Sequence, residues 1–187
     1  MKKVVSAVLT AAMVVGMGVS VLAATPSKTV ADEVKATGEA KVTGIAGIIG
    51  DVKVSAVQDT AQTEEVLKDV VANVDLKEAA GASEETKTAV DVTAAQTFNV
   101  ETSNLANFAT VELTIESKVV EAAYAENEEV AVLVAVPTVA ADGTVTYTYH
   151  TVTGKFVNGK VVLNLSGRQI KSYGSNFTLL ALKTIED

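Results

Sequence analysis

The stretch "VAVLVAVPTVAADGTVTYTYHTVTGKFVNGKVVLNL", residues 130–165, decides the fold class. It contains three runs that are rich in valine, threonine and tyrosine, the residue types that favour β-strands. Asp142-Gly143 follows the first run and Asn158-Gly159 precedes the last. Both dipeptides tolerate the positive φ angles that tight hairpin turns require. We therefore expect the three runs to pair antiparallel, in chain order.

The first of these runs is apolar on both faces. Alternate positions carry valine on one side and alanine or leucine on the other: Val130, Val132, Val134 and Val136 against Ala131, Leu133 and Ala135. A strand with this pattern is covered on both sides, which predicts a central place in its sheet. Pro137 should limit the strand, because proline cannot donate to a strand ladder.

One amphipathic helix is expected outside the β runs. Residues 60–74 place an apolar stripe at three- and four-residue spacing, formed by Val66, Leu67, Val70, Val71 and Val74. A shorter helical turn is expected in "DLKEAAG", residues 75–81. Further β runs lie within 41–57, 88–116 and 176–183, and those at 88–94 and 97–101 are expected to be separate. The expected fold is mainly β: an antiparallel two-layer β-sandwich with one amphipathic helix at about 60–74, covering an edge or an open end.

The N-terminal residues predict export. Lys2 and Lys3 precede a long apolar run that ends in small residues, the pattern of a cleavable signal peptide over residues 1–24. A retained membrane anchor is the alternative that a run of this length allows. Residues 25–40 are polar and small, and predict a flexible linker before a single β-sandwich domain at 41–187. We expect a secreted, extracellular protein, free or associated with the cell wall, and no membrane contact after cleavage.

Composition excludes several classes of function. The chain carries a formal net charge of -8, which becomes more negative when Lys2 and Lys3 are removed, and Arg168 is its single arginine. Such a surface repels phosphate backbones, so nucleic acid is not an expected partner. The absence of cysteine excludes disulfides, thiol catalysis and thiolate metal sites. No cofactor is expected.

Neither a catalytic nor a metal site is predicted. His150 is the only histidine, it lies in the middle of a strand run, and no G-x-S-x-G nucleophile motif accompanies it. "AENEE", residues 125–129, gathers carboxylates but lacks the alternating ligands of an EF-hand loop, so we expect a solvated loop there. A hydrolase whose carboxylates converge only in the fold is a more remote alternative.

Tyrosines dominate the candidate ligand-binding residues. Alternation places Tyr147, Tyr149 and Thr151 on one face of their strand, and His150 among threonines on the other. If this face packs against the opposing sheet, the tyrosines belong to the core. If it is exposed, it could stack on sugar rings.

The order of segments over about residues 75–183 resembles small β-sandwich modules of Gram-positive bacterial surface and secreted proteins. The shared pattern is an apolar strand, a tyrosine- and histidine-bearing strand, a glycine-containing hairpin and a closing serine-aromatic strand, for which this chain offers Tyr173 and Phe177. The resemblance implies a non-catalytic structural or cell-surface interaction role. The alternative is a carbohydrate- or cell-wall-polymer-binding module that uses Tyr147 and Tyr149. Expected partners are a cell-wall polymer, a polysaccharide or another surface protein.

Overall fold

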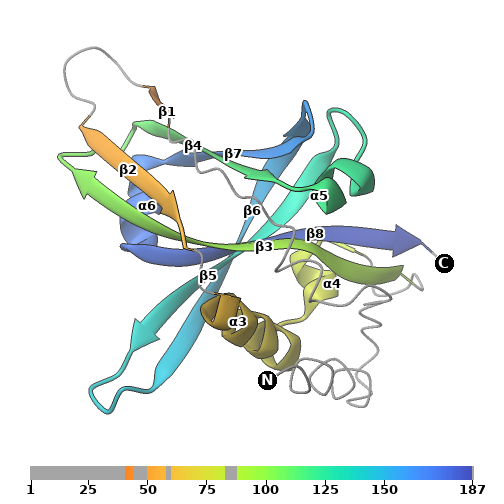
Figure 1. Ribbon diagram of the computed structural model, residues 1–187, viewed down its shortest axis with the longest axis horizontal. Helices are drawn as coiled ribbons and strands as arrows, with labels where there is room; N and C mark the ends of the chain where they lie inside the picture. The colour runs from red at the N-terminus through yellow and green to blue at the C-terminus, as the bar shows by residue number, and fades with distance from the viewer. Residues whose placement is uncertain (1–40, 44–49, 58–59, 83–87, 187) are drawn as a thin grey trace.

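The fold is mainly β and antiparallel, as expected. A computed structural model of the chain describes residues 41–43, 50–57, 60–82 and 88–186 (Figure 1). Within these residues, eight strands form one sheet in the order β1-β4-β7-β6-β5-β8-β3-β2. The strands are β1 (Lys41–Thr43), β2 (Asp51–Ala56), β3 (Thr88–Ser103), β4 (Thr110–Glu116), β5 (Glu129–Val139), β6 (Val145–Val157), β7 (Lys160–Ser166) and β8 (Asn176–Glu186).

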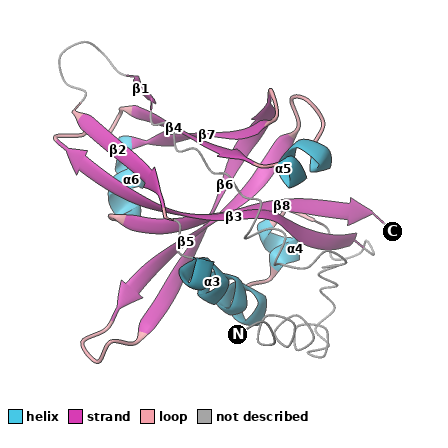
Figure 2. Cartoon of the chain, viewed as in Figure 1, coloured by secondary structure: helices cyan, strands magenta, loops and turns pink. Residues whose placement is uncertain are grey.

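The sheet curls around the larger of the two apolar clusters that the described part of the chain forms. Side chains from β3, β4, β5, β7 and β8 meet there, and the largest fully buried ones include Phe98, Leu113, Leu163, Phe177 and Leu179. The two layers of the expected sandwich are therefore two parts of one hydrogen-bonded sheet. Figure 2 shows two short helices beside the sheet, α5 (Lys118–Ala123) and α6 (Gly167–Tyr173). They add Val120 and Ile170 to the same cluster.

A second apolar cluster lies on the outer face of β3, β5 and β8. It joins Leu133, Ala135, Leu180 and Leu182 of the sheet to α3 (Thr60–Asn73) and α4 (Leu76–Ala79). The helix expected at 60–74 is confirmed, and Val66 and Val70 of its stripe are buried. Its place differs from the expected edge or open end, because the outer face of the central strands is itself apolar and must be covered.

The hairpins expected from Asp142-Gly143 and Asn158-Gly159 are confirmed. β5 pairs with β6 along its whole length, and β6 pairs with β7 through a turn in which Asn158 and Gly159 both have positive φ. β5 is also central, since β8 pairs with its other edge from Ala131 to Ala135. Pro137 does not end the strand, because β5 continues to Val139. Pairing with β8 stops at Ala135, so Pro137 lies where β5 has no strand partner on that edge and proline is tolerated.

Three features differ from the expectation. β8 inserts between β5 and β3, so the sheet is not a simple meander. The two β runs expected within 88–101 form one strand, β3, with an irregularity between Val92 and Ala94. Tyr173, expected in the closing strand, is the last residue of α6 because a capping box formed by Ser166 and Gln169 begins a helix before β8. The expected signal peptide and linker lie outside the described residues.

Candidate functional site

The tyrosine face of β6 points outward and meets helix α3. Tyr147 and Tyr149 are half-buried and pack against the outer apolar cluster, with their ring centroids 6.4 Å apart. The Tyr149 hydroxyl donates a short hydrogen bond to Asp69 Oδ2 of α3. The expectation that these tyrosines share one face is confirmed. That face lies outside the inner core and is partly covered and partly exposed.

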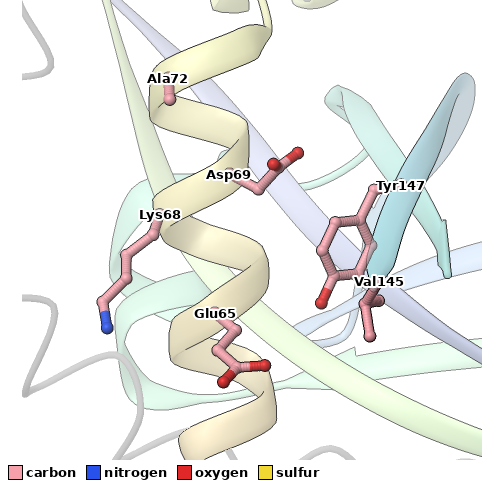
Figure 3. Close-up of a pocket in the computed structure, with 6 residues that line it drawn as sticks. All are labelled: Glu65, Lys68, Asp69, Ala72, Val145 and Tyr147. Atoms are coloured by element: carbon pink, nitrogen blue, oxygen red, sulfur yellow. The ribbon is translucent and has the colours of Figure 1, made fainter. Parts of the chain in front are cut away.

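A hollow of about 370 Å³ opens between α3 and the start of β6. Tyr147 and Val145 line it from the strand, while Glu65, Lys68, Asp69 and Ala72 line it from the helix. Figure 3 shows the Glu65 and Asp69 carboxylates on the side of α3 that faces the strand, whereas the Lys68 ammonium points away from Tyr147. The hollow therefore presents one aromatic ring beside two carboxylates.

Burial and neighbouring carboxylates both raise the pKa values of Tyr147 and Tyr149 and so favour their protonated hydroxyls. Burial raises the pKa of Tyr147, and the negative charges of Glu65 and Asp69 raise it further. Burial also raises the pKa of Tyr149, together with the hydrogen bond that its protonated form donates to Asp69. The two rings present neutral hydroxyls, with the Tyr149 hydroxyl already engaged by Asp69.

Thr151, the third candidate ligand-binding residue, is exposed on the same face of β6 and does not line the hollow. His150 is exposed and points to the other face, as expected from alternation. Its ring centroid lies 5.5 Å from that of Tyr173 at the end of α6. The neighbouring aromatic ring gives His150 a packing contact between β6 and α6.

Alternation along the strands did not reveal a polar cluster near α5. Lys183 of β8 forms an ion pair with Glu128 at 2.5 Å, and its ammonium lies 5.1 Å from the centre of the Tyr124 ring. The buried Tyr124 hydroxyl lies 2.8 Å from the Thr93 hydroxyl. The signal available in the sequence was Lys183, the one charged residue in the run "NFTLLALK", residues 176–183.

Opposing influences set the pKa values of the carboxylates in this cluster. Burial opposes ionisation of Glu128, but the hydrogen bonds from Lys183 and from the Ala125 amide outweigh it and lower the pKa. Asp91 pairs with Lys183 in the strand register, and burial raises the pKa of Asp91 against a hydrogen bond from the Val92 amide. Glu128 is therefore held as an anion by its neighbours.

Two carboxylates within residues 125–129 accept hydrogen bonds from backbone amides. The Glu126 carboxylate accepts from the Asn158 amide at 3.1 Å, and Glu128 accepts from the Ala125 amide at 2.8 Å. Within the described residues, no group of three His, Asp or Glu side chains could hold a metal ion. Helices long and apolar enough to span a bilayer are likewise missing from the described part of the chain.

Comparison of the chain with protein-family models, with curated proteins and with solved structures gave no match.

Proposed function

We propose that this chain is a secreted, non-catalytic β-domain with a structural or cell-surface interaction role, whose partner surface is the end of the β5–β6 hairpin. The supporting observation is the apolar end of this hairpin. β5 beyond Ala135 lies outside the segment that pairs with β8, so Val136–Val139 and their β6 partners Val145–Thr148 form a two-stranded ribbon. Figure 1 shows this ribbon projecting from the rest of the sheet.

Two apolar side chains sit opposite each other on the ribbon. Val139 pairs with Val145 in the register, and their exposed fractions are 67% and 43%. They continue the face on which Tyr147 lies, next to the hollow. Large apolar side chains that gather on one projecting element commonly mark a protein or ligand contact.

Binding to isolated Gram-positive cell walls and to purified wall surface proteins tests this proposal. We expect the secreted chain to bind at least one of them, and the double variant Val139→Ser, Val145→Ser to lose roughly tenfold in affinity, as is typical when apolar anchors are truncated. Phe108→Ser is the matched control, because Phe108 is 58% exposed but lies in the loop between β3 and β4. Equal loss in the control variant, or no binding by the parent chain, would contradict the proposal.

The second candidate is a carbohydrate- or cell-wall-polymer-binding module, which the hollow favours. An aromatic ring can stack on the apolar face of a sugar while nearby carboxylates accept hydrogen bonds from its hydroxyls. Tyr147 would supply the ring, and Glu65 and Asp69 the carboxylates. Tyr149 would support the site by holding Asp69 through its hydroxyl.

A glycan array probed with the secreted chain separates this candidate from a protein partner. We expect Tyr147→Ala to abolish any glycan binding, because removal of one stacking ring costs the main contact, and Phe108→Ala to leave it unchanged. Glycan binding that survives Tyr147→Ala would exclude the hollow as the sugar site.

A further inference from the structure

One edge of β6 is open over much of its length. β6 pairs with β5 from Val145 to Lys155, but with β7 only from Lys155 to Val157. From Leu163 onward, the register pairs β7 with β4 alone. Among the described residues, the second edge of Val145–Gly154 therefore has no strand partner, and no backbone hydrogen bond to a loop or helix replaces one.

This open edge lacks the usual protection against strand pairing. Its sequence, "VTYTYHTVTG", has no lysine, arginine, carboxylate or proline, although charged residues make up 20% of the chain. Natural proteins normally protect an exposed edge with such residues or with a covering segment. β-branched and aromatic side chains, which favour strand pairing, occupy most of the ten positions.

Charges stand at the two ends of the open edge and have opposite signs. Asp142 lies in the turn before β6 and Lys155 follows the open segment, and both are exposed. If two copies pair antiparallel about a twofold axis, the same segment serves both partners. The end of each edge that carries Asp142 then lies near the end of the other edge that carries Lys155.

We propose that two copies of this chain pair antiparallel through the β6 edge at Val145–Gly154 and form a symmetric dimer with a continuous sheet across it. On β6, Val145–Thr148 of this edge lie on the projecting ribbon (Figure 1). Each copy carries a formal net charge of -8, and the opposite charges at the two ends of the edge would offset part of the repulsion expected between copies. This dimer goes beyond the proposed function, since it needs neither a wall polymer nor a second protein.

Sedimentation velocity of the full chain over a concentration series tests the dimer. We expect a monomer-dimer equilibrium whose dissociation constant rises about tenfold in Thr148→Lys, because the added like charges meet at the centre of the interface. Asn164→Lys adds the same charge at an exposed position on β7 and should leave the dissociation constant within about twofold of the parent. A monomeric parent chain, or a Thr148→Lys variant that dimerises like the parent, would overturn the proposal.

Charge exchange tests the antiparallel arrangement. Asp142→Lys gives an edge with two cationic ends, and Lys155→Asp gives one with two anionic ends. We expect each variant alone to dimerise more weakly than the parent and an equimolar mixture to recover a mixed dimer. The mixture also controls for damage to the turn, where Asp142 accepts from the Thr144 amide at 2.9 Å. Without recovery, the antiparallel pairing is wrong.

The outcomes for the dimer and for the proposed function are separate. A monomeric chain that still binds cell walls through Val139 and Val145 would overturn the dimer alone. A dimer that binds no wall component would overturn the interaction role alone. If the chain is a monomer that binds an extended peptide of unrelated sequence at the β6 edge, that peptide is the occupant of the edge and the dimer is wrong.

Discussion

The hydroxyl of Tyr149 donates a hydrogen bond to Asp69 across the boundary between sheet and helix, joining residues 80 positions apart in the sequence. Tyr149 belongs to the open-edged strand β6, and Asp69 to α3, which covers the outer face of the sheet. This bond therefore ties the helix to the strand that carries the candidate site. It also leaves Tyr147 as the ring that faces the hollow.

We expect Tyr149→Phe to lower the free energy of unfolding by about 1 kcal/mol, less than the roughly 1.5–3 kcal/mol typical of a hydrogen bond to a charged group, because the pair is partly exposed. Tyr147→Phe is the control: among the described residues, its hydroxyl has no hydrogen-bond partner, and its removal should change the free energy by less than about 0.5 kcal/mol. Urea denaturation measures both. Equal effects would show that the bond to Asp69 adds nothing to stability.

The same bond predicts a dependence on alkaline pH. The folded state raises the pKa of Tyr149 above its ordinary value of 10.0, and does the same for Tyr124. The folded chain therefore binds these protons more tightly than the unfolded chain, and the free energy of unfolding should fall as pH rises above about 10. Thermal melting between neutral pH and pH 11 should show a shallower fall in Tyr149→Phe than in the parent. A fall of the same slope in both would refute the assignment.

Three threonine hydroxyls form a buried chain between α3 and the sheet. Thr97 lies 3.2 Å from Thr63 and 2.8 Å from Thr178, measured between the hydroxyl oxygens. We expect Thr97→Val to cost about 2 kcal/mol, because it deprives two buried hydroxyls of a partner at once. Thr63→Val should cost roughly half as much, because the Thr97 hydroxyl keeps its hydrogen bond with the Thr178 hydroxyl. Chemical denaturation of both variants gives the comparison, and a smaller effect at Thr97 than at Thr63 would be inconsistent with the chain.

The contribution of Asp91 to the free energy of unfolding should fall as pH rises, whereas that of a salt-bridged carboxylate rises. Burial raises its pKa above 3.8 in the folded state, so stability should fall as pH rises through this region and remain lower at neutral pH. Asp91→Asn removes this effect. The free energy of unfolding of the variant should exceed that of the parent by a few tenths of a kcal/mol at pH 7 and equal it near pH 3. The exposed Glu121→Gln of α5 changes the net charge equally and serves as control. Loss of stability at pH 7 in Asp91→Asn would count against the reasoning.

Gly167 marks the tightest approach of α6 to the loop between β3 and β4. A Cβ atom added there would stand 2.0 Å from the carbonyl oxygen of Ala106. We expect Gly167→Ala to cost more than about 2 kcal/mol, because two backbone segments must separate. Gly81→Ala meets no atom within 4 Å and has only its φ of +69° against it, so it should cost about 1 kcal/mol. Melting curves that rank the two variants in reverse would contradict this account.

Local signals predicted the parts of the fold that depend on neighbours in the chain. Asp142-Gly143 and Asn158-Gly159 indicated the two hairpins, and the apolar stripe at 60–74 indicated α3, because turns and helical faces are determined within a few residues. The pairing of β8 with β3 and β5 was not predicted, since nothing in the alternation of "NFTLLALK" names a partner strand. The helices α5 and α6 were missed because they are only six and seven residues long.

The candidate site was half predictable for the same reason. Period two placed Tyr147, Tyr149 and Thr151 on one face, which the structure confirms. It could not show that Asp69 would meet Tyr149, because helix packing brings distant segments together. The open edge of β6 also escaped the sequence, since only the register shows where β7 leaves β6.

The position of β8 has a consequence for when the chain can fold. It is the last strand in sequence, yet it lies between β5 and β3 and is the strand that joins the two sides of the sheet. Its partners in β3 are about ninety residues earlier in the chain, and pairings of such separation form slowly. The sheet therefore cannot close from its N-terminal strands onward as they are synthesised. Closure waits for residues 176–186, so the sheet can close only after the other seven described strands have been synthesised.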